Sequence, residues 1–271
     1  MAPYYVAHLE DNLIEPMAEC HRLEYAQGVG VELGEKMQAL RSSSAMTFNL
    51  LGNRDVTISD PALAPPGHYA IRYEYQLPTL RGNPNKANLD ARLAMHDGST
   101  VVYCEMKMAE WMLGWMKMLR VSYLDPDRYL IPKEDARVFI DFFSSLVTGE
   151  PNRKGSRKTR FHRFDALQMA KHLLAIYSSL EDEGASSIKL VNCVWEVRDT
   201  SFLAPYEKKY EMWLATERYE FMEFVSAARP VLDLFEKRGC DFSIDYLPVD
   251  RFLACLEKTD EQKAKLARYL M

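Results

Sequence analysis

The stretch NLDARLAMHDGSTVVYCEMK, residues 88–107, decides the fold because it specifies a β-hairpin. Two runs rich in apolar residues, 88–95 and 100–107, flank the pair Asp97-Gly98. Asp-Gly is a preferred pair for a two-residue type I′ turn, whose twist matches that of the strands it joins. The stretch therefore predicts two antiparallel strands connected by a tight turn.

The register of this hairpin separates an apolar face from a polar face. A turn at Asp97 and Gly98 places Asp90 opposite Glu105 and Asn88 opposite Lys107. The face expected against the core carries Leu89, Ala91, Leu93, Met95, Val102, Cys104 and Met106. The other face carries Asp90, Arg92, Tyr103, Glu105 and Lys107.

The chain around the hairpin alternates between predicted strands and helices. Residues 68–77 alternate between apolar and polar side chains and predict a strand that follows a loop at 53–67, and a later strand is predicted at 188–197. Helical spacing of apolar residues predicts one or two helices within 31–51 and others at 108–120, 133–147, 161–180, 207–227, 230–237, 249–257 and 261–269. This order indicates an α/β fold with a central mixed β-sheet flanked by helices and a helical C-terminal extension.

Composition limits the classes of function. The chain has 271 residues, 48% of them hydrophobic, which is enough for a sizeable core. Its formal net charge is −5, so any contact with nucleic acid must come from a local basic patch. The five cysteines include no Cys-x-x-Cys pair, which argues against a disulfide framework or a zinc ribbon. With no signal peptide and no membrane-spanning run, we expect a cytoplasmic protein without a membrane partner.

The opposed carboxylates of the hairpin need a partner. Like charges directly opposite each other destabilise an antiparallel pair, and a divalent cation between Asp90 and Glu105 would compensate. Oxygen ligands of this kind suit Mg²⁺ or Mn²⁺. Lys107 lies two residues from Glu105 and shares its face, so its ammonium group can approach a metal-bound water or a phosphoryl oxygen. Such a group is suited to phosphodiester hydrolysis.

The same residues resemble the D…E-x-K signature of PD-(D/E)XK nucleases. Leu89-Asp90 is followed on the next strand by Cys104-Glu105-Met106-Lys107, and the order of elements over 31–197 is similar to that family's core. The chain has Asn-Leu-Asp where the family label reads Pro-Asp. The resemblance implies a restriction-endonuclease-like core over 1–204, with a helical insertion near 108–160, and a helical extension over 205–271 packed on the same domain.

The resemblance also assigns roles to residues. It implies that Asp90, Glu105 and the Met106 carbonyl bind Mg²⁺ or Mn²⁺ and that Lys107 helps to position and activate the attacking water. It further implies a deoxyribonuclease whose products carry 5′-phosphate ends. Gln168, on the predicted helix after the hairpin, is similar to a glutamine that orients the lysine or the phosphate in some branches. Asp165 and His172 share its polar stripe, since the spacings are three and four.

Two glutamates outside the hairpin are weaker candidates. Glu74, on the polar face of the first predicted strand, either binds the same metal cluster or is a surface residue. Glu35 is a candidate for a water-mediated ligand, although a surface position is favoured for it.

A basic run precedes the long predicted helix. Residues 152–163 contain no acid, and their cations are candidates for binding DNA phosphates: Arg153, Lys154, Arg157, Lys158, Arg160 and Arg163. A solvated loop is the ordinary alternative for such a run. For the hairpin, the alternative is a solvated sheet face with an ordinary ion pair. For the whole chain, the alternatives are a catalytically silent nucleic-acid-binding or interaction protein on the same fold, or an RNase, and a homodimer would suit double-strand cleavage.

Overall fold

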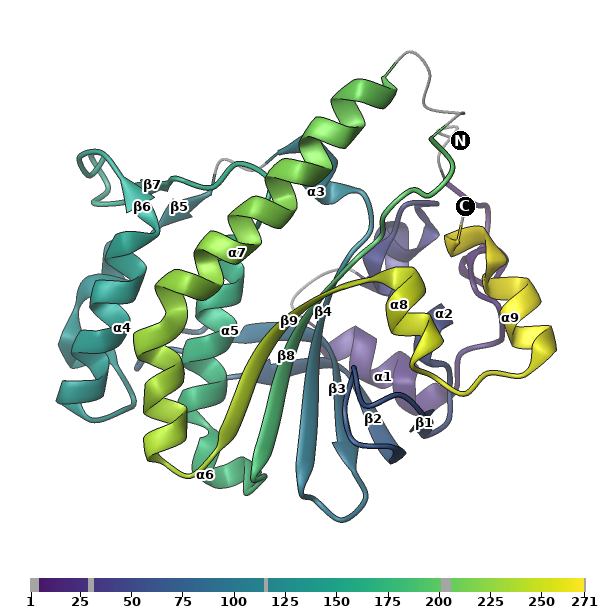
Figure 1. Ribbon diagram of the computed structural model, residues 1–271, viewed down its shortest axis with the longest axis horizontal. Helices are drawn as coiled ribbons and strands as arrows, with labels where there is room; N and C mark the ends of the chain where they lie inside the picture. Colours follow the sequence, from purple (N-terminus) through teal and green to yellow (C-terminus); the bar gives the residue numbers. More distant parts are fainter. Residues whose placement is uncertain (1–4, 29–31, 115–116, 201–205, 271) are drawn as a thin grey trace.

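The computed structural model describes residues 5–28, 32–114, 117–200 and 206–270. Its centre is a curled, mixed sheet in the order β1-β2-β3-β4-β8-β9 (Figure 1). The strands are β1 (Val56–Ile58), β2 (Gly67–Leu77), β3 (Ala87–Met95), β4 (Thr100–Lys107), β8 (Ser187–Val194) and β9 (Asp241–Pro248). Neighbours from β1 to β4 are antiparallel, whereas β8 is parallel to both β4 and β9. The predicted α/β class is confirmed.

Helices cover both faces of the sheet (Figure 1). The layer on one face contains α1 (Glu19–Gln27), α2 (Ser43–Leu51), α8 (Val249–Ala254) and α9 (Asp260–Leu266), with single turns η1 (Leu9–Asn12), η2 (Glu32–Lys36) and η6 (Ala267–Tyr269). The layer on the other face contains α4 (Lys133–Ser145), α5 (Ala166–Ser178), α6 (Leu180–Glu183) and α7 (Glu207–Lys237). Short elements between β4 and α5 are α3 (Glu110–Leu113), η3 (Val121–Leu124) and η4 (Pro126–Arg128).

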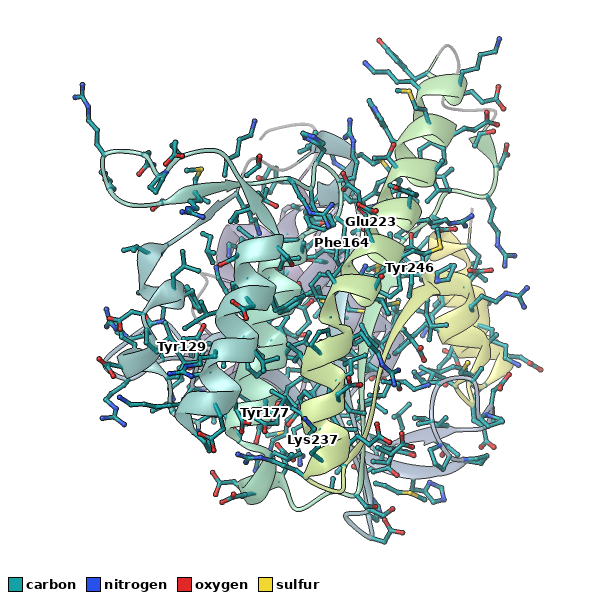
Figure 2. All side chains as sticks on the ribbon, turned by 60° about the vertical axis from the view of Figure 1, so that its left-hand side comes forward. Tyr129, Phe164, Tyr177, Glu223, Lys237 and Tyr246 are labelled. Atoms are coloured by element: carbon teal, nitrogen blue, oxygen red, sulfur yellow. The ribbon has the colours of Figure 1, made fainter. Side chains whose placement is uncertain are left out.

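The two helical layers give the sheet two hydrophobic cores. We call them the α2 core and the α5 core, after the helix that contributes to each. In the α5 core, aromatic rings join α7 to α5 and the loop before it: Phe164 packs on Phe224 at 5.1 Å between ring centroids, and Tyr177 packs on Phe235 at 5.0 Å. Figure 2 shows Tyr177 near the Lys237 end of α7 and Phe164 near Glu223. These contacts fix α7 against α5 and the loop before it.

The hairpin has the predicted register but a different turn. Leu93 pairs with Val102, as expected, and both side chains are buried. The strands are joined by four residues, 96–99, and the Gly98 amide donates to the Met95 carbonyl at 2.9 Å. Gly98 has φ +75°, which suits glycine. The prediction of a two-residue turn was therefore wrong, although the longer loop leaves the register unchanged.

Other elements of the structure differ from those predicted from the sequence. The helix predicted at 108–120 is short α3 followed by β5 (Met118–Leu119), while residues 115 and 116 lie outside the described residues. β5 joins β6 (Val147–Thr148) and β7 (Arg157–Thr159) in a small second sheet, in the order β5-β7-β6. The two helices predicted at 207–227 and 230–237 are one helix, α7, which continues through Pro230.

β9 was missed by the sequence prediction, which treated the chain after residue 204 as mostly helical and assigned no element to 238–248. It pairs with β8 over its whole length, so the C-terminal part of the chain completes the central sheet and also adds helices to it. Among the described residues, no helix combines the length and the apolar character needed to cross a membrane.

Candidate active site

The two carboxylates predicted for the reaction centre meet where β3 separates from β4. The β3–β4 ladder ends with Ala91 opposite Cys104, and Asp90 and Glu105 follow next on their strands. Beyond this point the Asp90 side chain replaces a strand partner, because its Oδ2 accepts the backbone N–H of Met106 at 2.6 Å. The N–H and C=O groups of a strand residue point to the same edge, so the Met106 carbonyl also faces the Asp90 side.

Glu74 of β2 extends this row of carboxylates to a third strand. The β2–β3 register places it opposite Asp90, and its side chain is buried. Asn88, predicted opposite Lys107, instead donates its amide to Glu74. Glu74 has φ +48°, and no other non-glycine residue among those described has a positive φ. Such a backbone angle costs about 1 to 3 kcal/mol and is concentrated at functional sites.

The same backbone angle breaks the strict alternation predicted for β2. Residues before Glu74 pack in the α2 core, namely Tyr69, Ile71 and Tyr73. Residues after it pack in or against the α5 core, namely Tyr75 and Leu77. On β3 the change occurs at Asp90, since Leu89 belongs to the α5 core whereas Ala91 and Leu93 belong to the α2 core. The predicted single apolar face is therefore divided at the carboxylate row.

Glu105 is buried with a donor on each oxygen. Lys107 Nζ lies 2.6 Å from Oε1, and His172 Nε2 lies 2.9 Å from Oε2. A carboxylate accepts hydrogen bonds, so the His172 proton belongs on Nε2. Burial alone would raise the pKa of Glu105, but the charge of Lys107 and the contacts with His172 lower it to about 2. Glu105 is therefore an anion over the physiological pH range.

The other two carboxylates of the row have the opposite shift. Burial, followed by the charges of Glu105 and Glu74, raises the pKa of Asp90 well above its usual range. Burial and the charges of Glu32 and Glu105 raise the pKa of Glu74 to about 7, even though Asn88 acts against this. The three carboxylates thus repel one another in a region where water screens them poorly.

Lys107 is held as an ammonium group by the residues around it. Its Nζ also donates to Gln168 Oε1 of α5, at 2.9 Å. Burial would lower the pKa of Lys107, but the charges of Glu105, Asp165 and Asp90 raise it above its ordinary value. Gln168 is itself positioned by Asp165, which caps α5 and accepts the Gln168 amide. The structure thus places Asp90, Glu105, Lys107, Gln168 and Glu74 around one pocket.

A pocket of about 410 Å³ opens onto this group, and two acids that sequence reasoning missed, Glu32 and Glu110, line it. Glu32 lines the pocket, and its oxygens accept from Ser44 Oγ and Lys36 Nζ, both at 2.7 Å. Nothing in the sequence distinguishes Glu32 from Glu35, which had been considered instead. The side chain of Glu35 lies outside the described part of the structure.

The donor set fits a hard divalent cation that keeps part of its water. Asp90, Glu105 and the Met106 carbonyl are the candidate oxygen ligands, and Mg²⁺ is usually bound through one or two carboxylates. Within the described ranges, no three His, Cys, Asp or Glu side chains form a group that could hold a metal ion. Lys107 and His172 already engage Glu105, so metal binding has to compete with these donors.

The predicted basic run is divided between exposed cations and cations engaged in the fold. Arg160 pairs with Glu223 at 2.7 Å and lies over the Phe161 ring. Arg163 donates to the Trp111 and Met112 carbonyls. Arg153, Lys154 and Lys158 are exposed, as is Arg160 despite its contacts, and Arg157 of β7 is half-buried. Arg160 and Arg163 therefore have structural contacts that phosphate binding would have to replace.

Two buried glutamates of α7 were also missed. Glu220 accepts the backbone N–H groups of His162, Arg163 and Phe164 at 2.8 to 2.9 Å. Glu217 is 1% exposed, and burial followed by the charge of Glu220 raises its pKa to about 8. The sequence did contain a signal, because both acids interrupt the inward-facing stripe of this amphipathic helix, which Tyr210, Phe224, Ala228 and Val231 continue.

Comparisons with known proteins add no name to this site. The chain matches no model in a scan of known protein families, and searches of curated proteins and of solved structures also find no match.

Proposed function

We propose that this protein is a Mg²⁺- or Mn²⁺-dependent nuclease of the PD-(D/E)XK type that hydrolyses phosphodiester bonds of DNA and leaves 5′-phosphate ends. The observation that carries the proposal is the contact set at the end of β4. There Asp90 binds the Met106 amide, Glu105 binds Lys107, and Lys107 binds Gln168. The order α2, β2-β3-β4, α5 and then parallel β8 supports a restriction-endonuclease-like core.

Each residue of the group has a role that its surroundings support. Asp90, Glu105 and the Met106 carbonyl would hold the metal, and Glu74 is a candidate for a further ligand. The bound metal would polarise a phosphoryl oxygen and lower the pKa of the attacking water. Lys107 stays protonated, so it serves as a positioned positive charge beside the phosphate and not as a general base. Gln168 keeps the ammonium group in place.

The test is cleavage of DNA by the purified chain with Mg²⁺ or Mn²⁺, with EDTA as the metal-free condition. We expect Asp90→Asn and Lys107→Ala to lower the cleavage rate by roughly a hundredfold or more, because a ligand charge or a charge-stabilising group is lost. Lys133→Ala is the matched control, since Lys133 is exposed at the start of α4. Its rate should equal that of the wild type.

Metal affinity separates the two effects. Calorimetry with Mn²⁺ should show weakened binding for Asp90→Asn and retained binding for Lys107→Ala, since Lys107 is not a ligand. A panel of linear, circular and single-stranded DNA together with RNA identifies the substrate. Full activity of both variants would contradict the proposed centre. Absence of metal binding and of cleavage in the wild type would favour the catalytically silent binding protein.

A further inference from the structure

Three cations gather beside the reaction centre, outside the basic run that the sequence emphasised. Lys117 pairs with Asp165, Lys171 lies 5.4 Å from the centre of the Tyr123 ring, and Arg120 is exposed at the end of β5. Burial lowers the pKa of Lys171, and the charges of Lys117 and Arg120 lower it further, against the effect of Asp165. Lys171 is therefore close enough to Lys117 and Arg120 for their charges to repel its own.

This cation cluster is connected to the catalytic lysine through α5. Asp165 is the N-cap of α5, and Gln168, which accepts from Lys107, lies in the first turn of the same helix. The charge of Asp165 also raises the pKa of Lys107. The cluster therefore begins within one helical turn of the residue that holds the ammonium group of the reaction centre.

The cluster also continues into the small sheet. β7 pairs with β5, with Lys158 opposite Met118, and the Thr159 amide donates to the Lys117 carbonyl at 3.0 Å. This pairing brings exposed Lys158 alongside the Lys117–Arg120 segment. Positively charged residues thus lie on α5 (Lys171), at the two ends of β5 (Lys117 and Arg120) and on β7 (Lys158).

We propose that Lys171, Arg120 and Lys158 bind the sugar-phosphate backbone of DNA on one side of the bond to be cleaved, an inference that depends on the proposed nuclease function. Like charges at close range are costly unless an anion neutralises them, and the protein as a whole carries a net charge of −5. A polyanion with regularly spaced phosphates fits a set of separate cations better than a single small anion does. The contacts are sequence-independent, because phosphates carry no base identity.

The experiment compares two triple variants in binding to a short DNA duplex, measured by fluorescence anisotropy in EDTA so that cleavage is absent. One carries Arg120→Gln, Lys158→Gln and Lys171→Gln. The control carries Lys133→Gln, Arg137→Gln and Lys237→Gln, which remove equal charge from exposed positions on α4 and α7. We expect the first variant to bind more weakly and to flatten the log–log salt dependence by about 0.9 for each lost phosphate contact. The control should keep the slope of the wild type.

A second variant and a second assay separate weaker DNA binding from a loss of folding or of catalysis. Lys171 is partly buried, so the double variant Arg120→Gln/Lys158→Gln, at exposed positions, should show a smaller flattening with an unchanged melting temperature. In cleavage assays KM should rise while kcat at saturating DNA is retained. Equal salt slopes for the variants and the control would overturn the inference, while metal-dependent cleavage by the wild type would leave the nuclease proposal intact. A reduced salt slope for the triple variant of a protein that cleaves no substrate would support the DNA-backbone site and contradict the proposed nuclease activity.

Discussion

Glu105 of β4 and Glu217 of α7 are both buried glutamates whose pKa is lowered by the charge of Lys107. Their overall pKa shifts nevertheless have opposite directions. Glu105 is 2% exposed and has a donor on each oxygen, and its pKa is lowered to about 2. Glu217 is 1% exposed, its Oε2 has no hydrogen-bond partner, and its pKa is raised to about 8. Burial is nearly the same at the two sites, so the neighbouring charges decide the difference: Lys107 lowers the pKa of Glu105, and Glu220 raises the pKa of Glu217.

The protonation state of a buried acid depends on the groups beside it. A buried carboxylate that an ammonium group and a histidine N–H contact remains an anion, whereas one whose pKa is raised by a neighbouring carboxylate takes up a proton. Glu105 therefore suits a metal ligand, and Glu217 suits a neutral group in the wall behind the lysine. Glu220, three residues after Glu217 on the same helix, is a third case, because its donors are backbone amides.

The largest effect that tests this comparison is expected for Glu220→Gln. A glutamine has one accepting oxygen where glutamate has two, because its other terminal atom is an NH₂ donor. One or more of the three amides at 162–164 would therefore lose its acceptor. We expect the free energy of unfolding to fall by roughly 3 to 5 kcal/mol, since hydrogen bonds to a charged group are worth about 1.5 to 3 kcal/mol each. Urea unfolding measures this. A change no larger than that of the exposed Glu211→Gln would contradict the assigned role.

The same substitution at Glu217 should have the opposite sign. The pKa of Glu217 is raised from 4.5 to about 8 in the folded protein, so between these values the unfolded chain is ionised while the folded chain keeps its proton. The folded state therefore loses stability as the pH rises from about 5 to about 8. Glu217→Gln removes this loss because glutamine has no charge to gain.

We expect Glu217→Gln to be more stable than the wild type by roughly 2 to 3 kcal/mol at about pH 8, and similar to it at about pH 5. Urea unfolding at both pH values checks the prediction, with Glu211→Gln as the control on an exposed part of α7. Equal stability of Glu217→Gln and the wild type at the higher pH would show that Glu217 is ionised in the folded protein.

The sequence could predict those parts of the site that are local in the chain. Asp90, Glu105 and Lys107 lie within one hairpin, so strand alternation and a turn signal were enough to bring them together, even with the turn itself misassigned. Gln168 could be found because helical spacing places it on a polar stripe. Such inferences need only the geometry of a single strand pair or helix.

Features that depend on distant contacts could not be predicted in the same way. Glu32 enters the pocket because Ser44 and the start of α2 hold it, and nothing near it in the sequence reports this. The positive φ of Glu74 results from the junction of the two cores and not from any turn residue. β9 is different, since Phe242, Ile244 and Tyr246 alternate with polar residues in 241–245, and that signal could have been used.

The smallest effect concerns the donor that distinguishes Glu105 from Glu217. His172→Leu removes the Nε2–H contact and leaves one Glu105 oxygen without its buried donor, which is the situation of Glu217. Partners of metal ligands of this kind typically change metal affinity by about 10- to 100-fold, and Lys107 still holds the other oxygen, so we expect roughly tenfold weaker Mn²⁺ binding. His172→Gln keeps an N–H donor near the same position and should restore most of the affinity. Calorimetry gives both values, with the exposed His162→Leu as control. If leucine and glutamine at this position weaken binding equally, His172 acts through packing alone, and the charge state of Glu105 is set by Lys107 without it.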